Sequence, residues 1–273
     1  MSEARPPARF ERIVVACDPT PPGSAALAAA AALAASLQAE LAGLFVEDVN
    51  LLRMAALPFT RELGLASALL RPIETTDIER EFRRHAEQTR KALEAAALAS
   101  SLRWSFQVIR GQPLTAALSA VSDADLLVVK ATAHPAARSV RERPRAAPEA
   151  AAARARHGLR VRPVAVLFDG SPQAERALAL AAALAERVGC PLTLWVAADN
   201  EADFGNMRSR ARDLLAASDG AATILGLRGR DLPTVAEAVA AASPAALVWH
   251  DVLDSEQLAV LLSVVRCPLV LAR

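Results

Sequence analysis

The sequence predicts an α/β protein in which two consecutive units each form a parallel sheet covered by helices on both faces. First, shifting the chain by 151 residues places Asp18 on Asp169 and extends a gapless match over about thirty residues. Second, Arg12–Cys17 and Pro163–Phe168 are near-continuous apolar runs, which are typical of strands buried on both faces. Third, strand and helix patterns alternate, and such units require right-handed crossovers in a parallel sheet.

Each of these first strands is followed by a helix start. Thr20 with Pro21, and Ser171 with Pro172, place a capping hydroxyl before a proline at the first helical position. We expect the two helices to run to about Gln38 and Gly189.

A second strand follows in each unit, at 40–48 and 191–199. The first unit then carries extra residues, 49–63, before a long helix that we expect Thr76 and Glu79 to open as a capping box. This helix should present one apolar stripe to the sheet. The stripe comprises Ile78, Phe82, Ala86, Thr89 and Leu93.

The rest of the first unit is predicted as an edge strand at 103–111, a short helix over 112–121 and a buried strand at 123–130. The second unit repeats this plan more compactly. Its elements are a helix over 204–217, a strand over 223–229, a helix over 231–242, a strand over 245–250, a helix over 255–265 and a strand over 267–272.

These patterns place the first domain at 1–150, with an insertion over 47–80 and a linker at about 131–160, and the second domain at 161–273. The linker is rich in Ala, Arg and Pro, and we identify no fifth strand for the first domain in it. That leaves open a free sheet edge that could recruit another molecule.

Composition restricts the class of protein. The formal net charge of +1 predicts no steering of nucleic acid, and the alanine-rich helices are too weakly apolar to suggest a membrane span. The N-terminus has no apolar signal core, and three widely spaced cysteines form no metal or disulfide pattern. We therefore expect a cytoplasmic protein.

Each unit has an aspartate after its first strand, within Asp-Gly-Ser at 169–171 in the second unit, and a glycine before its third helix, Gly111 or Gly229. Together with the strand at 123–130, these features resemble a tandem universal stress protein. The resemblance covers roughly residues 10–130 and 161–273. It implies two tandem adenine-nucleotide α-hydrolase-like, Rossmann-like domains with strand order 3-2-1-4-5. It also implies dimeric or pseudo-dimeric packing and a role in stress survival.

Nucleotide-binding members of this family carry a glycine-rich loop after the fourth strand, where backbone N–H groups can approach phosphate oxygens. In the first unit Lys130, Ala133 and Arg143-Pro144 stand at those positions. In the second unit His250 starts a segment, 251–267, that has no glycine. Both phosphate cradles are therefore absent from the sequence.

The resemblance implies that Asp18 and Asp169 occupy the position that contacts the nucleoside in binding members. Without the phosphate loop we favour the alternative that each caps its turn. Lys130 could reach an anion, although a solvated lysine at a strand end is the commoner case. A residual nucleotide cleft would comprise Asp18, Val46, Gly111, Lys130, Asp169 and Gly229.

Other polar features point to no chemistry. We interpret His250 as structural, since no second histidine has ligand spacing nearby, and the linker arginines as solvated, since no aromatic residue interleaves them. No catalytic constellation can be assembled, so an enzyme is disfavoured. The apolar insertion 49–63 is expected to pack on its own domain or across the interface.

These features predict a universal stress protein that lacks the ATP phosphate-binding motif and acts without catalysis, through a protein partner or an unidentified ligand. No cofactor is expected, and the two units would form a pseudo-dimer within one chain, with homodimerisation possible. The alternative is an ATP- or AMP-binding switch, or a weak ATPase, that uses Asp18, Gly111 and Lys130.

Overall fold

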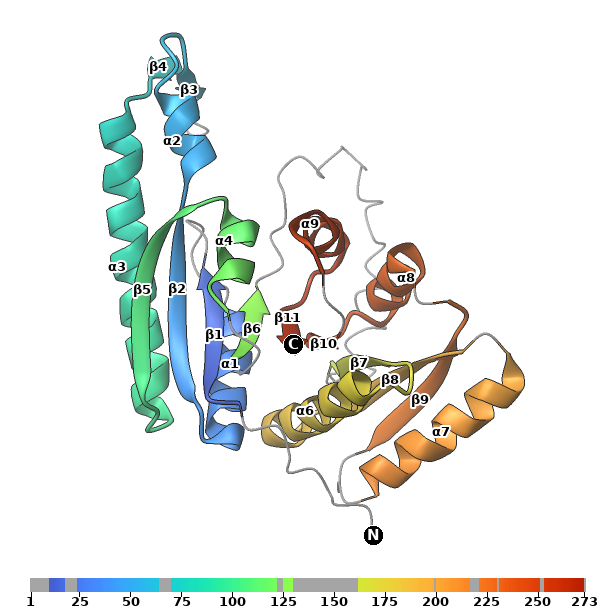
Figure 1. Ribbon diagram of the computed structural model, residues 1–273. Helices are drawn as coiled ribbons and strands as arrows, with labels where there is room; N and C mark the ends of the chain where they lie inside the picture. Colours follow the sequence, from blue (N-terminus) through green and yellow to red (C-terminus); the bar gives the residue numbers. More distant parts are fainter. Residues whose placement is uncertain are drawn as a thin grey trace, which may run out of the picture.

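A nine-stranded sheet forms the centre of the protein in the computed structural model, which describes residues 10–17, 24–63, 70–121, 125–129, 162–198, 200–216, 221–229, 231–250 and 253–272 (Figure 1). Its order is β5-β2-β1-β6-β11-β10-β7-β8-β9. The strands are β1 (Arg12–Cys17), β2 (Glu40–Asp48), β5 (Trp104–Gly111), β6 (Asp125–Val129), β7 (Val164–Phe168), β8 (Leu192–Ala197), β9 (Ala222–Leu227), β10 (Ala246–Trp249) and β11 (Leu269–Ala272). The predicted α/β class is confirmed.

The strand order within each half follows the predicted pattern up to the fourth strand. In the C-terminal half, β9-β8-β7-β10-β11 is the order 3-2-1-4-5, and every neighbouring pair is parallel. In the N-terminal half, β5-β2-β1-β6 is 3-2-1-4, again all parallel. The order across the whole sheet thus differs from two separate five-stranded sheets.

The two halves join through one antiparallel pair of strands. β11 lies beside β6, with Leu269 opposite Val129 and Leu271 opposite Leu127. The expectation of a free edge beside the fourth strand is therefore wrong, because the last strand of the chain fills it. The predicted linker, 131–160, lies outside the described residues. Since β6 and β11 are antiparallel, the carboxyl ends of the strands lie at opposite edges of the sheet in the two halves.

Helices cover both faces of this sheet, as predicted. One face packs against α1 (Ser24–Leu37), α3 (Thr75–Ala99), α6 (Pro172–Val188) and α7 (Glu201–Leu215). The other packs against α4 (Pro113–Ser119), α8 (Leu232–Ala242) and α9 (Ser255–Val264).

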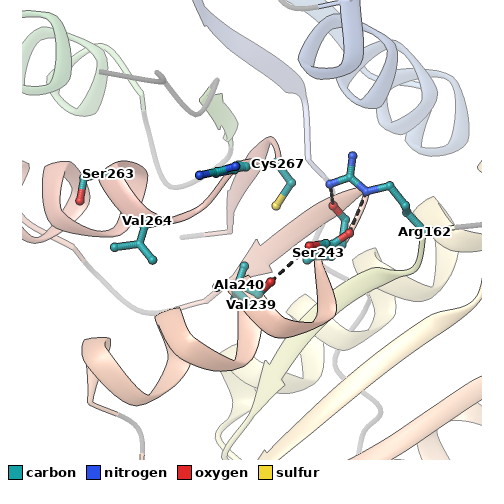
Figure 2. A pocket seen from close by; sticks show the side chains of 9 residues that line it. Arg162, Val239, Ala240, Ser243, Ser263, Val264 and Cys267 are labelled. Atoms are coloured by element: carbon teal, nitrogen blue, oxygen red, sulfur yellow. Dashed lines mark hydrogen bonds between the residues drawn. The ribbon is translucent and has the colours of Figure 1, made fainter. Parts of the chain in front are cut away.

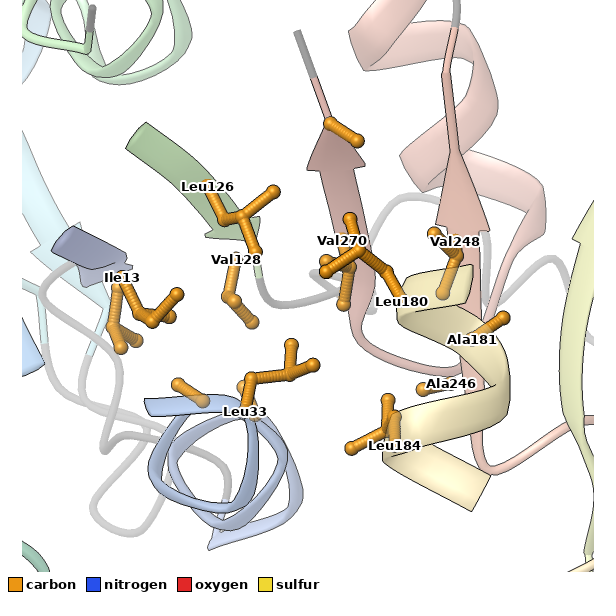
Figure 3. Close-up of a cluster of buried hydrophobic side chains, with 14 of the residues drawn as sticks. Ile13, Leu33, Leu126, Val128, Leu180, Ala181, Leu184, Ala246, Val248 and Val270 are labelled. Atoms are coloured by element: carbon orange, nitrogen blue, oxygen red, sulfur yellow. The ribbon is translucent and has the colours of Figure 1, made fainter. Parts of the chain in front are cut away.

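The apolar core runs across the junction without a break. α1 contacts α6 on one face, and α4 contacts α9 on the other. Figure 3 shows Leu33 of α1 facing Leu180 and Leu184 of α6. Both helices pack beneath Val128 of β6 and Val270 of β11, which are fully buried register partners. Burial of such side chains contributes about 1.5–3 kcal/mol each, so the halves stabilise one another.

The helix boundaries test the predicted caps. Ser171 caps α6 by accepting from the N–H of Ala174, with Pro172 at the first position, as predicted. α3 does not begin with the predicted capping box, because it starts at Thr75 after Glu74 and has no side-chain cap. Thr76 instead donates its hydroxyl to Glu74 Oε2, 3.3 Å away. Its predicted stripe is confirmed, since Phe82, Ala86, Thr89 and Leu93 are buried and Ile78 packs against them. Thr20 and Pro21 lie outside the described residues.

The insertion in the N-terminal half forms a projection beyond the sheet (Figure 1, upper left). It consists of α2 (Val49–Ala55) and a small hairpin, β3 (Arg61–Leu63) with β4 (Leu70–Pro72). Leu52 and Ala55 are buried, whereas the side chains of Met54, Leu57 and Phe59 are 49%, 60% and 92% exposed. The expectation that this apolar segment packs against its own domain or the interface is therefore wrong for the three side chains at the tip.

None of the helices in the described part of the chain is long and apolar enough to cross a membrane.

Candidate functional site at the carboxyl ends of β7 and β10

The strand order creates a switch point between β7 and β10. These two strands are neighbours, but the chain after β7 leads to β8 on one side of the pair, whereas the chain after β10 leads to β11 on the other side. In open α/β sheets, ligands bind outside the carboxyl ends of two such strands. Asp169 directly follows β7, and His250 directly follows β10. The pairing brings His250 Nε2 within 3.4 Å of Asp169 Oδ1.

The carboxylate of Asp169 is held by the turn that it starts. The backbone N–H of Ser171 donates to Asp169 Oδ1 at 3.0 Å, and Gly170 between them has a φ of 77°, a conformation that glycine adopts without strain. Burial raises the pKa of Asp169, but hydrogen bonds from the Ser171 hydroxyl and N–H and the nearby His250 outweigh it, so the pKa lies below its usual value. The Asp169 side chain is 14% exposed. Little of this carboxylate remains available to a ligand.

His250 is enclosed more completely than its partner. It is 7% exposed, and its Nδ1 has no hydrogen-bond partner among the described residues. The indole N–H of the preceding residue, Trp249, also lacks a partner within that part of the chain. The imidazole of His250 and the carboxylate of Asp169 thus form a largely buried polar pair at the carboxyl ends of β10 and β7.

The N-terminus of α9, the helix that follows the fourth strand of this half, is already occupied. Asp254 Oδ1 accepts from the N–H groups of Glu256 at 2.9 Å and Gln257 at 2.8 Å. The Gln257 side chain completes a capping box by accepting from the N–H of Asp254. The amides that would approach a phosphate in a glycine-rich loop here bind the protein's own carboxylate.

The described side chains around Asp169 do not form a serine-nucleophile arrangement. Ser171 is near Asp169 and His250, but its oxygen accepts from the Ala174 N–H and its hydroxyl is bonded to Asp169 rather than to the histidine. A serine nucleophile requires the imidazole to take its proton. Among the described residues no group of three or more His, Cys, Asp or Glu could hold a metal ion.

The structure describes four of the six predicted site residues, and they are divided between the two halves of the sheet. Asp18 and Lys130 lie outside the described residues. Gly111 ends β5 and Gly229 follows β9, and these two strands lie at opposite ends of the sheet. Val46 is 1% exposed within the core that α4 covers, so its side chain has no surface for a ligand.

Gly111 has a packing role. A Cβ there would lie 3.1 Å from the Cβ of Ala116 in α4, which explains a small residue at this position. The contact of His250 with Asp169 was not predicted. The predicted strand order could have indicated that these two residues are neighbours, because the order 3-2-1-4-5 places the first strand beside the fourth.

Comparisons with known proteins support the fold. No protein-family model matches the chain, and no curated protein matches it significantly. Among solved structures, a universal stress protein from Archaeoglobus fulgidus is 11% identical, with 96% of each chain covered and a TM-score of 0.52. A protein of the universal stress protein family from Burkholderia pseudomallei is 19% identical, with 42% of this chain and 97% of that chain covered and a TM-score of 0.33. The first likeness shows that the chain shares the α/β fold of a universal stress protein.

Proposed function

We propose that this chain is a universal stress protein that acts without catalysis, through a protein partner or a ligand other than ATP. The fold supports the class, and its two halves would act as a pseudo-dimer in the cytoplasm. The observation that carries the proposal is the carboxylate of Asp254 at the N-terminus of α9, bonded to two backbone N–H groups.

The electrostatics at this helix end disfavour a nucleotide. A helix N-terminus attracts phosphate through free N–H groups and about half a positive charge. In α9 the carboxylate of Asp254 accepts hydrogen bonds from two of these N–H groups and offsets the partial positive charge of the helix end. The connection from β10, residues 250–254, contains no glycine, the residue that lets a backbone approach phosphate most closely.

The nucleoside position beside this helix is equally unsuited to ATP. The oxygen of Asp169 that faces His250 already accepts from the Ser171 N–H. A ribose hydroxyl would have to displace one of these contacts.

The exposed tip of the insertion supports a protein partner. Met54, Leu57 and Phe59 present large apolar side chains to solvent on one short segment. Exposed apolar groups of this kind commonly mark contact surfaces.

Isothermal titration of the full chain with ATP and millimolar magnesium tests the proposal. We expect no binding up to millimolar ATP, no nucleotide released on denaturation and no phosphate release. Tight binding that Asp169→Ala abolishes would overturn it. Tight binding that only Asp18→Ala abolishes would also overturn it and would favour a nucleotide switch in the N-terminal half.

A further inference from the structure

A cavity of about 480 Å³ opens between the C-terminal ends of α8 and α9 (Figure 2). It lies where β7, β10 and β11 begin, at the opposite ends of these strands from Asp169 and His250. Figure 2 shows Ser263 and Val264 of α9 on one side and Val239, Ala240 and Ser243 on the other. Its volume falls within the roughly 300–1,000 Å³ of small-molecule sites.

One arginine of the cavity is fixed in place. Arg162 Nε donates to the carbonyl oxygen of Ser243 at 2.7 Å, and Nη2 donates to that of Pro244 at 2.5 Å. A guanidinium has five N–H groups, so these two bonds orient the group and leave donors for another acceptor. The geometry is thus pre-organised before any ligand arrives.

A second arginine, Arg266, lines the same cavity, and the lining contains no Asp or Glu. No described carboxylate lies within ion-pair distance of Arg162 or Arg266. Burial raises the pKa of the Cys267 thiol, which also lines the cavity, to about 11, although Arg162 acts in the opposite direction. The thiol is therefore neutral at pH 7 and supplies no negative charge.

The two helix ends do not balance these cations. Each helix C-terminus carries about half a negative charge, so α8 and α9 together contribute about one against two guanidinium groups. The hydroxyls of Ser243 and Ser263 donate to carbonyl oxygens of their own helices, to Ala240 at 3.2 Å and Val260 at 2.7 Å. The cavity keeps a positive excess, and its lining combines the two serines with the apolar side chains of Val239, Ala240 and Val264.

We propose that this cavity binds a small organic anion, whose carboxylate pairs with Arg162 and Arg266 while its apolar body packs between Val239 and Val264. Planar guanidinium groups suit a carboxylate because they can offer two parallel N–H donors. The site goes beyond the proposed function, because it lies away from the switch point and shares no residue with it. Failure of one proposal leaves the other standing.

Calorimetric titration of the full chain with hexanoate at pH 7.5 and low salt tests this assignment. We expect saturable binding, no comparable binding of hexan-1-ol or inorganic phosphate, and weaker binding at high salt. Arg266→Ala should weaken binding roughly fivefold to tenfold, as loss of one charge-assisted contact at a partly exposed site predicts. The matched control is Arg212→Ala, an exposed arginine on α7 outside the cavity, which should leave affinity unchanged.

A second variant tests the cavity itself. Ser263→Trp fills it without changing its charge and should abolish hexanoate binding, while thermal melts verify that each variant is folded. Absence of any binding of hexanoate would overturn the proposal. So would equal affinity for hexan-1-ol or phosphate, or binding that survives both Arg266→Ala and Ser263→Trp.

Discussion

Leu269 of β11 lies opposite Val129 of β6, in the one antiparallel ladder of the nine-stranded sheet. This pairing joins residues from the end of the chain to the last described strand of the N-terminal half. Leu269 is fully buried on the face covered by α8 and α9. The stability of each half therefore depends on a contact supplied by the other.

Leu269→Ala should lower the free energy of unfolding by about 2–5 kcal/mol, because it leaves a cavity at a closed strand pair. Urea unfolding followed by circular dichroism measures this change. Hydrogen exchange should also show weaker protection of β1 and β6 amides, far from the substitution in sequence. The matched control is Leu225→Ala on edge strand β9, where the leucine is 45% exposed and a much smaller loss is expected. Loss of protection confined to the C-terminal half would show that the two halves unfold independently.

Local patterns were sufficient to predict most of the elements. The apolar runs at Arg12–Cys17 and Glu40–Asp48 are strands with the bounds predicted, and Ser171 with Pro172 starts α6. These signals act over a few residues, where sequence and conformation are directly coupled.

The pairing of strands that are far apart in the sequence could not be predicted from local patterns. Nothing near β6 in the sequence indicates that β11 closes its edge, because the partner lies at the other end of the chain. At the candidate site, the positions of Asp169 and His250 followed from strand order, but their contact and the capping by Asp254 depend on side-chain geometry. The exposed tip at Phe59 was missed because an apolar segment alone does not distinguish a buried loop from a projecting one.

The lowered pKa of Asp169 predicts a specific pH dependence. A carboxyl whose pKa is lower in the folded than in the unfolded state stabilises the protein above about pH 4, the unfolded value, and this stabilisation is lost as pH falls through the folded pKa. Asp169→Asn should cost roughly 1 kcal/mol at pH 7, since a neutral amide replaces a charged acceptor of the Ser171 N–H. It should also flatten the fall in stability below pH 4.

Urea unfolding at pH 7, 4 and 3 measures this slope for both proteins. Asp213→Asn, at an exposed aspartate on α7, removes the same charge away from the site and should keep the wild-type slope. An identical acid slope in the wild type and Asp169→Asn would mean that the hydrogen bonds from Ser171 do not stabilise the ionised carboxyl.

Phe59 at the tip of the insertion and Phe82 on the neighbouring helix α3 form a matched pair of phenylalanines. Phe82 on α3 is 2% exposed, whereas Phe59 at the tip is 92% exposed. Phe82→Ala should lower the free energy of unfolding by about 3–5 kcal/mol, and Phe59→Ala should change it by less than about 0.5 kcal/mol. Chemical denaturation of both variants checks this difference. A large loss from Phe59→Ala would place its ring against the protein instead of solvent.

Two glycines with open space around them should respond to alanine in opposite directions. Gly189, which ends α6, has a φ of 69°, and Gly205 lies within α7 without a positive φ. A Cβ at either position would meet no atom within 4 Å, so packing cannot account for any difference. The left-handed backbone should make Gly189→Ala destabilising by about 1–2 kcal/mol.

Gly205→Ala should stabilise the protein by about 0.5–1 kcal/mol, because alanine loses less backbone entropy in a helix. Thermal and urea unfolding of the two single variants measures both signs under the same conditions. The double variant should show nearly additive changes, because the two sites share no contact. If both substitutions destabilised the protein, then the open space around Gly205, or the helical conformation of its backbone, would be wrong. A neutral result at Gly189 would instead show that the end of α6 relaxes out of the left-handed conformation at little cost.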